Sequence, residues 1–202
     1  MKKLKIIIAT ISFILFITLA YLTLTNKLVS IDFAIIDYID TIRNDNLTLL
    51  LKIITFLGGT IFLIAFTILL LFILKNNKTK LTLVKNLLII TFLNVILKNA
   101  IQRNRPLGIA LIFEDSYSFP SGHAMISSSF YLHMINIIKE NLKNKTIKNL
   151  LIIIIYILIF LICFSRIYLG VHYFSDVLCG LLFGIGFTNI FDLITKKDKI
   201  ML

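Results

Sequence analysis

Several apolar runs of about 20 residues are the feature that most constrains how this chain can fold, because an α-helix of that length crosses a bilayer. Within the hydrocarbon core the backbone has no water to bind, so only helices and closed barrels can span it. The strict alternation of apolar and polar residues that marks barrel strands is absent. The chain is 58% hydrophobic and only 15% charged. We therefore interpret it as an all-α integral membrane protein.

The pattern predicts a bundle of six transmembrane helices and one short amphipathic helix, forming a single domain over residues 1–202. The predicted spans are residues 6–25, 48–74, 81–97, 122–138, 147–164 and 174–194. Residues 31–45 carry apolar side chains at three- and four-residue steps, which favours an amphipathic helix in the membrane interface over a plain polar connection. The first run is longer than a signal-peptide core and lacks a clear cleavage site, so we expect it to be retained.

Six residues inside the predicted spans carry structural expectations. Gly58 and Gly59 should let a neighbouring helix approach closely, and Asn94 should bond to another helix. Cys163 and Cys179 have no disulfide or metal-ligand spacing and are expected to be small apolar residues of the interior. His133 matches no catalytic pattern, so we expect it to be packed or hydrogen-bonded between helices.

The net charge of +11 could indicate a nucleic-acid partner, but the positions of the basic residues indicate a membrane topology instead. Two thirds of the 21 Lys and Arg residues lie at the two termini and in residues 75–85 and 139–148. Positive loops mark the cytoplasmic side. We therefore expect a plasma-membrane protein with both termini in the cytoplasm, with no nucleic acid bound. Segments 98–123 and 165–176 should then share the outer face.

The segment 165–176 holds polar residues between two apolar runs. If the second run is helical, His172 and Asp176 lie on one face, and the carboxylate can hold the imidazole in one tautomer. An imidazole held in this way suits a base or a nucleophile. Arg166 adds a planar cation suited to phosphate or carboxylate. Taken alone, these residues fit an ordinary helix–helix corner equally well.

Three cations, Lys98, Arg105 and Arg166, are predicted on the outer face without an acidic partner for each. Such charges at the end of a membrane bundle are costly unless an anion visits them. Each cation alone could equally be an interfacial anchor. Together they predict an anion-binding site.

The stretch Pro120-Ser121-Gly122-His123 is typical of a helix start. Free backbone N–H groups at such a start favour a phosphate. Ser121 could add a hydroxyl donor, and Gly122 leaves room for a ligand. His123 would lie beside the anion as a proton donor.

These residues resemble the three-part signature of the type-2 phosphatidic acid phosphatase family, the membrane branch of a superfamily that includes soluble acid phosphatases and vanadium haloperoxidases. The matching motifs are Lys98-x6-Arg105-Pro106, Pro120-Ser121-Gly122-His123 and Ser165-Arg166-x5-His172-x3-Asp176. All three motifs are intact and in order, and the six-helix layout extends the resemblance over nearly the whole chain.

The resemblance implies a role for each matched residue. His172 would be the nucleophile that forms a phosphohistidine, and Asp176 would orient and activate it. His123 would protonate the leaving oxygen and later activate water. The phosphate oxygens would be bound by Lys98, Arg105, Ser121, Gly122 and Arg166. No metal or cofactor is expected.

We expect an amphiphilic lipid phosphate as substrate, because a site at the membrane surface meets lipid headgroups. Undecaprenyl pyrophosphate is favoured over phosphatidylglycerol phosphate and phosphatidic acid, since an outward-facing bacterial enzyme meets it during envelope synthesis. A phosphotransferase using the same histidine is the alternative. A transporter is disfavoured because the ionisable residues gather at one face and no repeat is present. A haloperoxidase is disfavoured by the membrane architecture.

Overall fold

The computed structural model describes residues 2–197, with side chains described up to Thr195. Lys199, part of the predicted basic C-terminal end, lies outside the described residues. All the regular secondary structure in the described part of the chain is helical: α1 (Lys2–Leu24), α2 (Val29–Thr41), α3 (Asp45–Phe56), α4 (Thr60–Ile73), α5 (Asn77–Ile101), α6 (Gly122–Asn141), α7 (Lys145–Tyr168) and α8 (Phe174–Lys197). The all-α prediction is confirmed.

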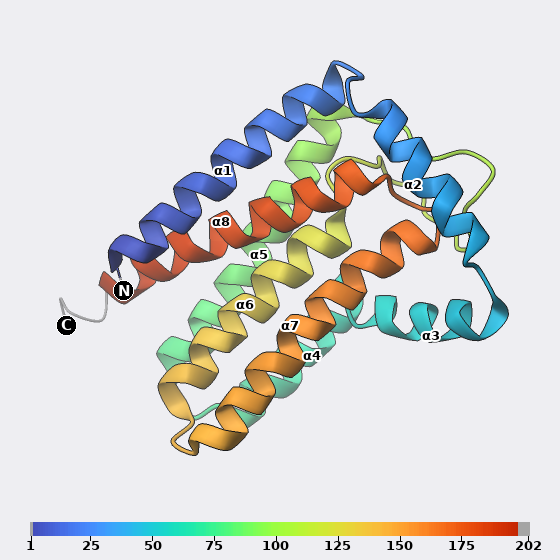
Figure 1. Ribbon diagram of the computed structural model, residues 1–202. Coiled ribbons are helices and arrows are strands. Elements are labelled where there is room, and N and C mark those ends of the chain that lie inside the picture. The colour runs from blue at the N-terminus through green and yellow to red at the C-terminus, as the bar shows by residue number, and fades with distance from the viewer. Residues whose placement is uncertain (1, 198–202) are drawn as a thin grey trace.

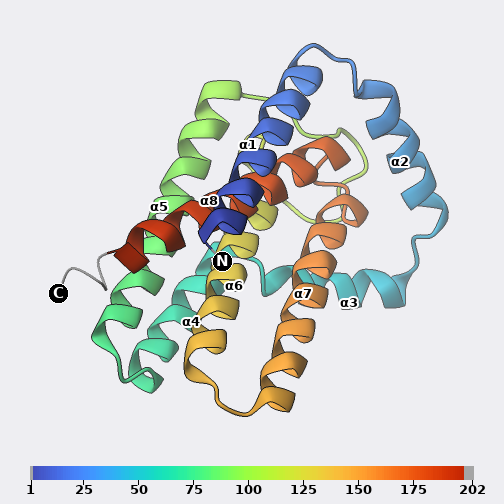
Figure 2. The same ribbon diagram turned by 60° about the vertical axis from the view of Figure 1, so that its left-hand side comes forward.

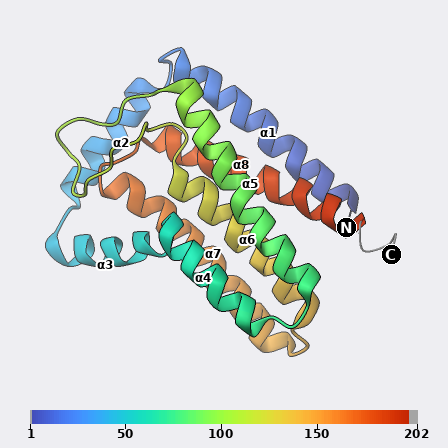
Figure 3. The same ribbon diagram turned by 180° about the vertical axis from the view of Figure 1, so that it is seen from behind.

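The two ends of the bundle differ in what they carry. Figure 1 shows α1 alongside α8, with the start of α1, the end of α8 and the α4–α5 and α6–α7 connections toward one end of the bundle. The other end holds α2, the turn between α7 and α8, and the irregular segment 102–121, which Figure 3 shows from behind. The segments predicted to share one face, 98–123 and 165–176, therefore do lie at the same end.

Within residues 2–197, four helices are long and apolar enough to cross a membrane on their own: α1, α5, α7 and α8. The predicted span 48–74 is not one straight helix, because it is divided into α3 and α4, which meet at an angle of 52°. The break falls at Leu57, Gly58 and Gly59, between the last residue of α3 and the first of α4. Glycine has the lowest helix propensity after proline, so a pair of glycines is a natural place for a helix to stop.

Helix α6 is the least apolar of the long helices because other helices surround it. It packs against α5, α7 and α8, and Figure 2 shows it inside the bundle. The hydroxyl-bearing residues Ser127, Ser128 and Ser129 are fully buried there. Close packing is possible because α8 presents glycines to α6: a Cβ at Gly180 would lie 2.7 Å from Ser121 O.

Helix α2 corresponds to the predicted amphipathic helix, and Ile39, one of its regularly spaced apolar residues, is buried, but two others are not. Ile31 and Tyr38, which belong to the three- and four-residue apolar pattern of segment 31–45, are 49% and 66% exposed. Asp32, predicted to fall between the apolar positions, is only 1% exposed. Asp32 is buried because its carboxylate is hydrogen-bonded to Arg103 and Ser175, which belong to other parts of the chain.

The other structural expectations are confirmed. A Cβ at Gly58 would lie 2.5 Å from the side chain of Ile162, so α7 does approach closely there. Asn94 donates to Pro120 O at 3.4 Å, which links α5 to the start of α6. Both cysteines are free and buried.

Candidate active site

A cavity of about 150 Å³ opens at the end of the bundle where the three motifs meet. The residues that line it are Thr60, Asn94, Lys98, Arg105, Glu114, Ser116, Gly122, His123, Ile126 and His172. The cavity thus brings together both predicted catalytic histidines. Ser121, Arg166 and Asp176 lie behind this lining and connect to it through hydrogen bonds or neighbouring residues.

His172 and Asp176 are linked through a third side chain that the sequence did not indicate. His172 precedes the first residue of α8, so the two residues do not share one helix face as expected. Their closest atoms, Nδ1 and Oδ2, are 3.7 Å apart, which is too long for a hydrogen bond. The buried Ser118 hydroxyl lies 3.3 Å from Nδ1 and donates to Asp176 Oδ2. Nδ1–H therefore donates to Ser118, which relays the bond to the carboxylate.

The other ring nitrogen of His172 faces the cations. Arg105 Nη1 lies 3.1 Å from Nε2 and donates to it, so Nε2 carries the lone pair. Burial lowers the pKa of His172 well below 6.5, and the charges of Arg166 and Arg105 lower it further. The imidazole is therefore held neutral, with Nε2 as the basic atom.

The Asp176 carboxylate is also held by Arg103, which no motif contains. Arg103 Nη1 donates to Asp176 Oδ1 and to Ser175 Oγ at 2.8 Å, while Nη2 donates to Asp32 Oδ2 at 2.8 Å. Asp32 in turn accepts from the Ser175 N–H at 2.9 Å. The guanidinium carbon lies 4.1 Å from the centre of the Tyr173 ring. This network explains why Asp32 of α2 is buried.

The three predicted anion-binding cations are not all unpaired, which corrects the sequence interpretation. Glu114 Oε1 accepts from Arg166 Nη2, and Oε2 lies 3.6 Å from Arg105 Nη2. Arg166 also donates to Thr55 Oγ1 at 2.8 Å, but its buried Nε has no partner. Lys98 donates to the Tyr117 carbonyl and lies 3.4 Å from Ser116 Oγ.

The predicted helix start is confirmed, since Ser121 is the N-cap residue of α6 and Gly122 its first residue. The Ser121 side chain does not cap the helix, and its buried Oγ has no hydrogen-bond partner. Gly122 leaves the cavity open, because a Cβ there would lie 3.0 Å from Asn94 Oδ1. An unsatisfied hydroxyl beside a helix N-terminus suits an anionic ligand.

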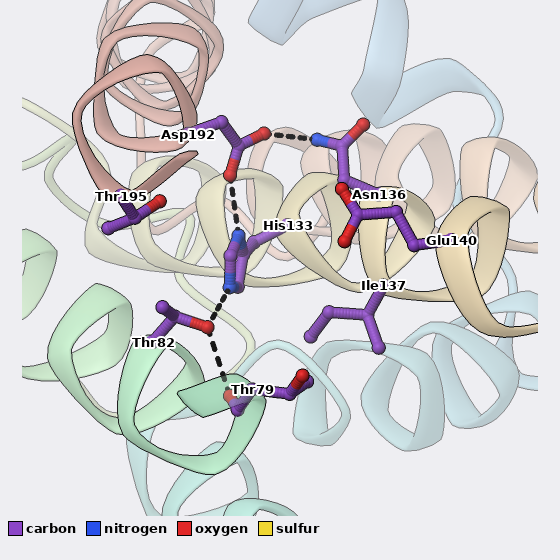
Figure 4. Close-up of a pocket in the computed structure, with 8 residues that line it drawn as sticks. All are labelled: Thr79, Thr82, His133, Asn136, Ile137, Glu140, Asp192 and Thr195. Carbon is purple, nitrogen blue, oxygen red and sulfur yellow. Dashed lines mark hydrogen bonds and ion pairs between the residues drawn. The ribbon is translucent and has the colours of Figure 1, made fainter. Parts of the chain in front are cut away.

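A second polar cluster lies at the opposite end of the bundle, around a small cavity of about 30 Å³ (Figure 4). His133 Nδ1 is 2.7 Å from Asp192 Oδ1, and its Nε2 is 3.3 Å from Thr82 Oγ1. Asp192 also accepts from Lys5 at 2.7 Å. The expectation that His133 bonds between helices is confirmed. This cluster ties α1, α5, α6 and α8 together.

Over residues 2–197 no three His, Cys, Asp or Glu side chains form a group that could hold a metal ion. A helical membrane bundle with two histidines, a buried carboxylate and several cations around one cavity defines a class of membrane enzyme that acts on an anionic group. The PAP2 superfamily model matches residues 79–199, more than half of the chain. The chain belongs to this superfamily and is a multi-pass membrane phosphatase that acts on a lipid phosphate.

Known proteins similar to this chain agree with that assignment. Phosphatidylglycerophosphatase B of Bacillus subtilis (strain 168) is 32% identical over 177 residues, which are 86% of this chain and 87% of that one. The crystal structure of a transmembrane PAP2-type phosphatidylglycerolphosphate phosphatase from Bacillus subtilis superimposes with a TM-score of 0.88 at 30% identity, covering 94% of this chain and 96% of that one. LpxE of Aquifex aeolicus gives a TM-score of 0.63 at 26% identity, covering 82% and 94%.

Four residues at the site escaped the sequence interpretation: Asp32, Arg103, Glu114 and Ser118. The charges of the first three were visible in the sequence, and Arg103 lies two positions before Arg105. An unmatched charge close to a motif was a usable signal for Arg103 and Glu114. Nothing local marks Ser118 or connects Asp32 with segment 165–176.

Proposed function

We propose that the enzyme removes a terminal phosphate from a lipid through a covalent intermediate on His172. The single observation that carries this proposal is the pair of opposed contacts on His172. Nδ1 is tied through Ser118 to Asp176, while Nε2 keeps its lone pair and faces the cations. A neutral, oriented imidazole whose unprotonated nitrogen faces an anion-binding cavity is arranged as a nucleophile once a phosphate draws the Arg105 hydrogen bond to itself.

In the first step, Nε2 of His172 attacks phosphorus and the bond from phosphorus to the lipid oxygen breaks. His123, which lines the same cavity, protonates that leaving oxygen. Lys98, Arg105 and Arg166 bind the phosphate oxygens, with Ser121 Oγ and the backbone at Gly122 as further donors. These groups stabilise the negative charge of the phosphoryl group in the transition state. Electrostatic stabilisation of this kind is the main source of catalysis in phosphoryl transfer.

In the second step, water attacks the phosphohistidine and the Nε2–phosphorus bond breaks. His123 takes the proton from that water, which restores both histidines and releases inorganic phosphate. The imidazolium that forms on His172 in the first step keeps its Nδ1 proton, which is hydrogen-bonded to Ser118 and stabilised by Asp176. It becomes a neutral imidazole again when the Nε2–phosphorus bond breaks. No metal ion is required, because the cations supply the positive charge.

We propose phosphatidylglycerol phosphate as the first substrate to test, because the named relative is a phosphatidylglycerophosphatase. Undecaprenyl pyrophosphate, which the sequence argument favoured, and phosphatidic acid belong in the same panel. Purified enzyme in detergent should release phosphate from at least one of them. Transfer of phosphate to a second lipid, with no free phosphate, would favour the phosphotransferase alternative.

We propose that the chain crosses the membrane six times, through α1, the bent α3–α4 pair, α5, α6, α7 and α8. Supporting this, α6 is 20 residues long and is surrounded by helices, so it does not need an apolar surface toward lipid. We propose that both termini are cytoplasmic and that the cavity faces outward. The basic connections, the start of α1 and the end of α8 lie at one end of the bundle, which supports that orientation.

The covalent mechanism is tested by rapid quench with a phosphorus-labelled substrate, followed by mapping of the acid-labile, base-stable phosphate. His172→Ala should form no labelled enzyme. His123→Ala should lose turnover, yet accept label slowly from para-nitrophenyl phosphate, whose leaving group needs no proton. His133→Gln is the matched control, and it should retain label on His172. Label on His123, or a His172→Ala variant that turns over normally, would refute the assignment.

A further inference from the structure

We propose that Glu114 is an internal competitor for the phosphate site, and that it determines how tightly the enzyme holds phosphate. This inference rests on the proposed function, because it assigns Arg105 and Arg166 to the substrate phosphate. Its starting point is that a carboxylate already lies in the cavity. Glu114 lines the cavity together with His123 and His172.

The contacts of Glu114 are those expected of a stand-in for phosphate. Its two carboxylate oxygens go to two different guanidinium groups, Oε1 to Arg166 Nη2 and Oε2 toward Arg105 Nη2. Asp176, a second buried carboxylate close to these cations, is held by Arg103 and Ser118 instead. Among the residues described, Glu114 is therefore the carboxylate that neutralises the predicted anion-binding arginines.

Glu114 satisfies the site only in part, so a phosphate can replace it. Arg166 Nε and Ser121 Oγ remain buried without a partner while Glu114 is in place. A carboxylate offers two oxygens and one negative charge, whereas a phosphate monoester offers three free oxygens and up to two charges. A phosphate in the cavity can bond the two arginines and also reach the donors that Glu114 leaves unsatisfied.

The replacement requires a side-chain rotation rather than a rearrangement of the segment. The backbone is fastened on both sides of Glu114, since the Leu111 N–H donates to Leu169 O at 2.9 Å and the Ser118 N–H donates to Arg103 O at 2.8 Å. The Glu114 side chain is 24% exposed, which leaves it a route outward. The carboxylate can leave the cavity while the segment stays in place.

A competitor and a structural residue predict opposite changes in phosphate affinity when the charge of Glu114 is removed. A purely structural Glu114 would hold the arginines in position, so removing its charge would weaken phosphate binding. A competitor has the opposite effect, because every phosphate that binds must first displace the carboxylate. Removing the charge should therefore tighten the binding of inorganic phosphate and of vanadate, and it should lower KM.

The test compares Glu114→Gln with Asp115→Asn. The glutamine has the same shape and loses one negative charge. Asp115 is the next residue, is exposed and also adds negative charge near Arg105. It therefore controls for the general change in charge. Vanadate inhibition of lipid phosphate hydrolysis and the rise in melting temperature with inorganic phosphate, at constant ionic strength, are measured for both variants and for the unmodified enzyme.

For Glu114→Gln we expect the vanadate inhibition constant to fall at least about tenfold, which corresponds to about 1.4 kcal/mol. The phosphate-induced rise in melting temperature should also be larger than in the unmodified enzyme. Asp115→Asn should change the inhibition constant by less than about twofold, since exposed charges are screened. An unchanged or raised constant in Glu114→Gln overturns the inference. An unmodified enzyme that responds to neither anion would instead refute the proposed phosphate site.

Discussion

Arg103 offers the sharpest test of how this fold positions its catalytic carboxylate. Its planar fork bonds Asp176 and Ser175 through Nη1 and Asp32 through Nη2. Arg103→Lys keeps the positive charge, but a single ammonium group cannot reproduce that geometry. At least one charge-assisted hydrogen bond is lost, and each contributes about 1.5 to 3 kcal/mol.

We expect that loss to appear mainly in kcat. Arg103 does not line the cavity, so KM for the lipid phosphate should change little. A loosened Asp176 supports the His172 imidazolium less well, and a kcat reduced by about ten- to a hundredfold corresponds to about 1.4 to 2.8 kcal/mol. The measurement is steady-state hydrolysis by purified enzyme, corrected for the folded fraction, together with the melting temperature.

Arg43→Lys provides the matched control. Its side chain is 16% exposed, as is that of Arg103, and it donates to Tyr168 O at the same end of the bundle. It makes no contact with Asp176, so this variant should lose stability without losing kcat. Asp32→Asn should also lower kcat, with a non-additive effect when combined with Arg103→Lys. A normal kcat in Arg103→Lys, or an equal loss in both lysine variants, would refute the positioning role.

Four further predictions follow from the site and the bundle. A cysteine at Asn77 should react with a membrane-impermeant reagent only in opened cells, whereas one at Leu107 should react in intact cells; the reverse pattern would overturn the orientation. Hydrolysis should survive EDTA and be inhibited by vanadate, and a loss in EDTA that magnesium restores would contradict the mechanism. Because the pKa of His172 is depressed, kcat should stay on its plateau as the pH falls through 6.5 and decline only at lower pH; a kcat that already falls to half of its plateau at pH 6.5 or above on the acid side would argue against a neutral His172. Asp192→Asn leaves Lys5 and His133 without their carboxylate at the far end of the bundle, so it should cost about 3 to 5 kcal/mol of stability and leave kcat unchanged; a drop in kcat of the folded variant would contradict this.

The sequence predicted the helices of this protein well because the membrane leaves the backbone few options. A long apolar run must satisfy its own N–H and C=O groups, so it becomes a helix whatever its neighbours do. The bounds of α5, α6, α7 and α8 follow the predicted spans closely. The short motifs were also readable, since each of their residues lies beside a helix end whose location follows from the same runs.

The sequence did not predict how the helices meet, and the unpredicted features all depend on that. The break at Gly58 and Gly59 follows from both low helix propensity and the close approach of α7. Asp32 is buried because α2 lies across the end of the bundle, where Arg103 and Ser175 reach it. No local periodicity encodes a bond between residues 71 positions apart.

For the candidate site, too, the sequence predicted which groups are present, and the packing of the helices decided which of them are in contact. The sequence by itself determined that a histidine, a carboxylate and several cations would gather at one end of a membrane bundle. Only the tertiary structure decided that Ser118 connects His172 to Asp176 and that Glu114 occupies the arginines. The physical reason is that hydrogen bonds require atoms to lie within about 3 Å of each other. Separation on that scale is set by the packing of helices and by the path of segment 102–121, and not by the spacing of residues along the chain.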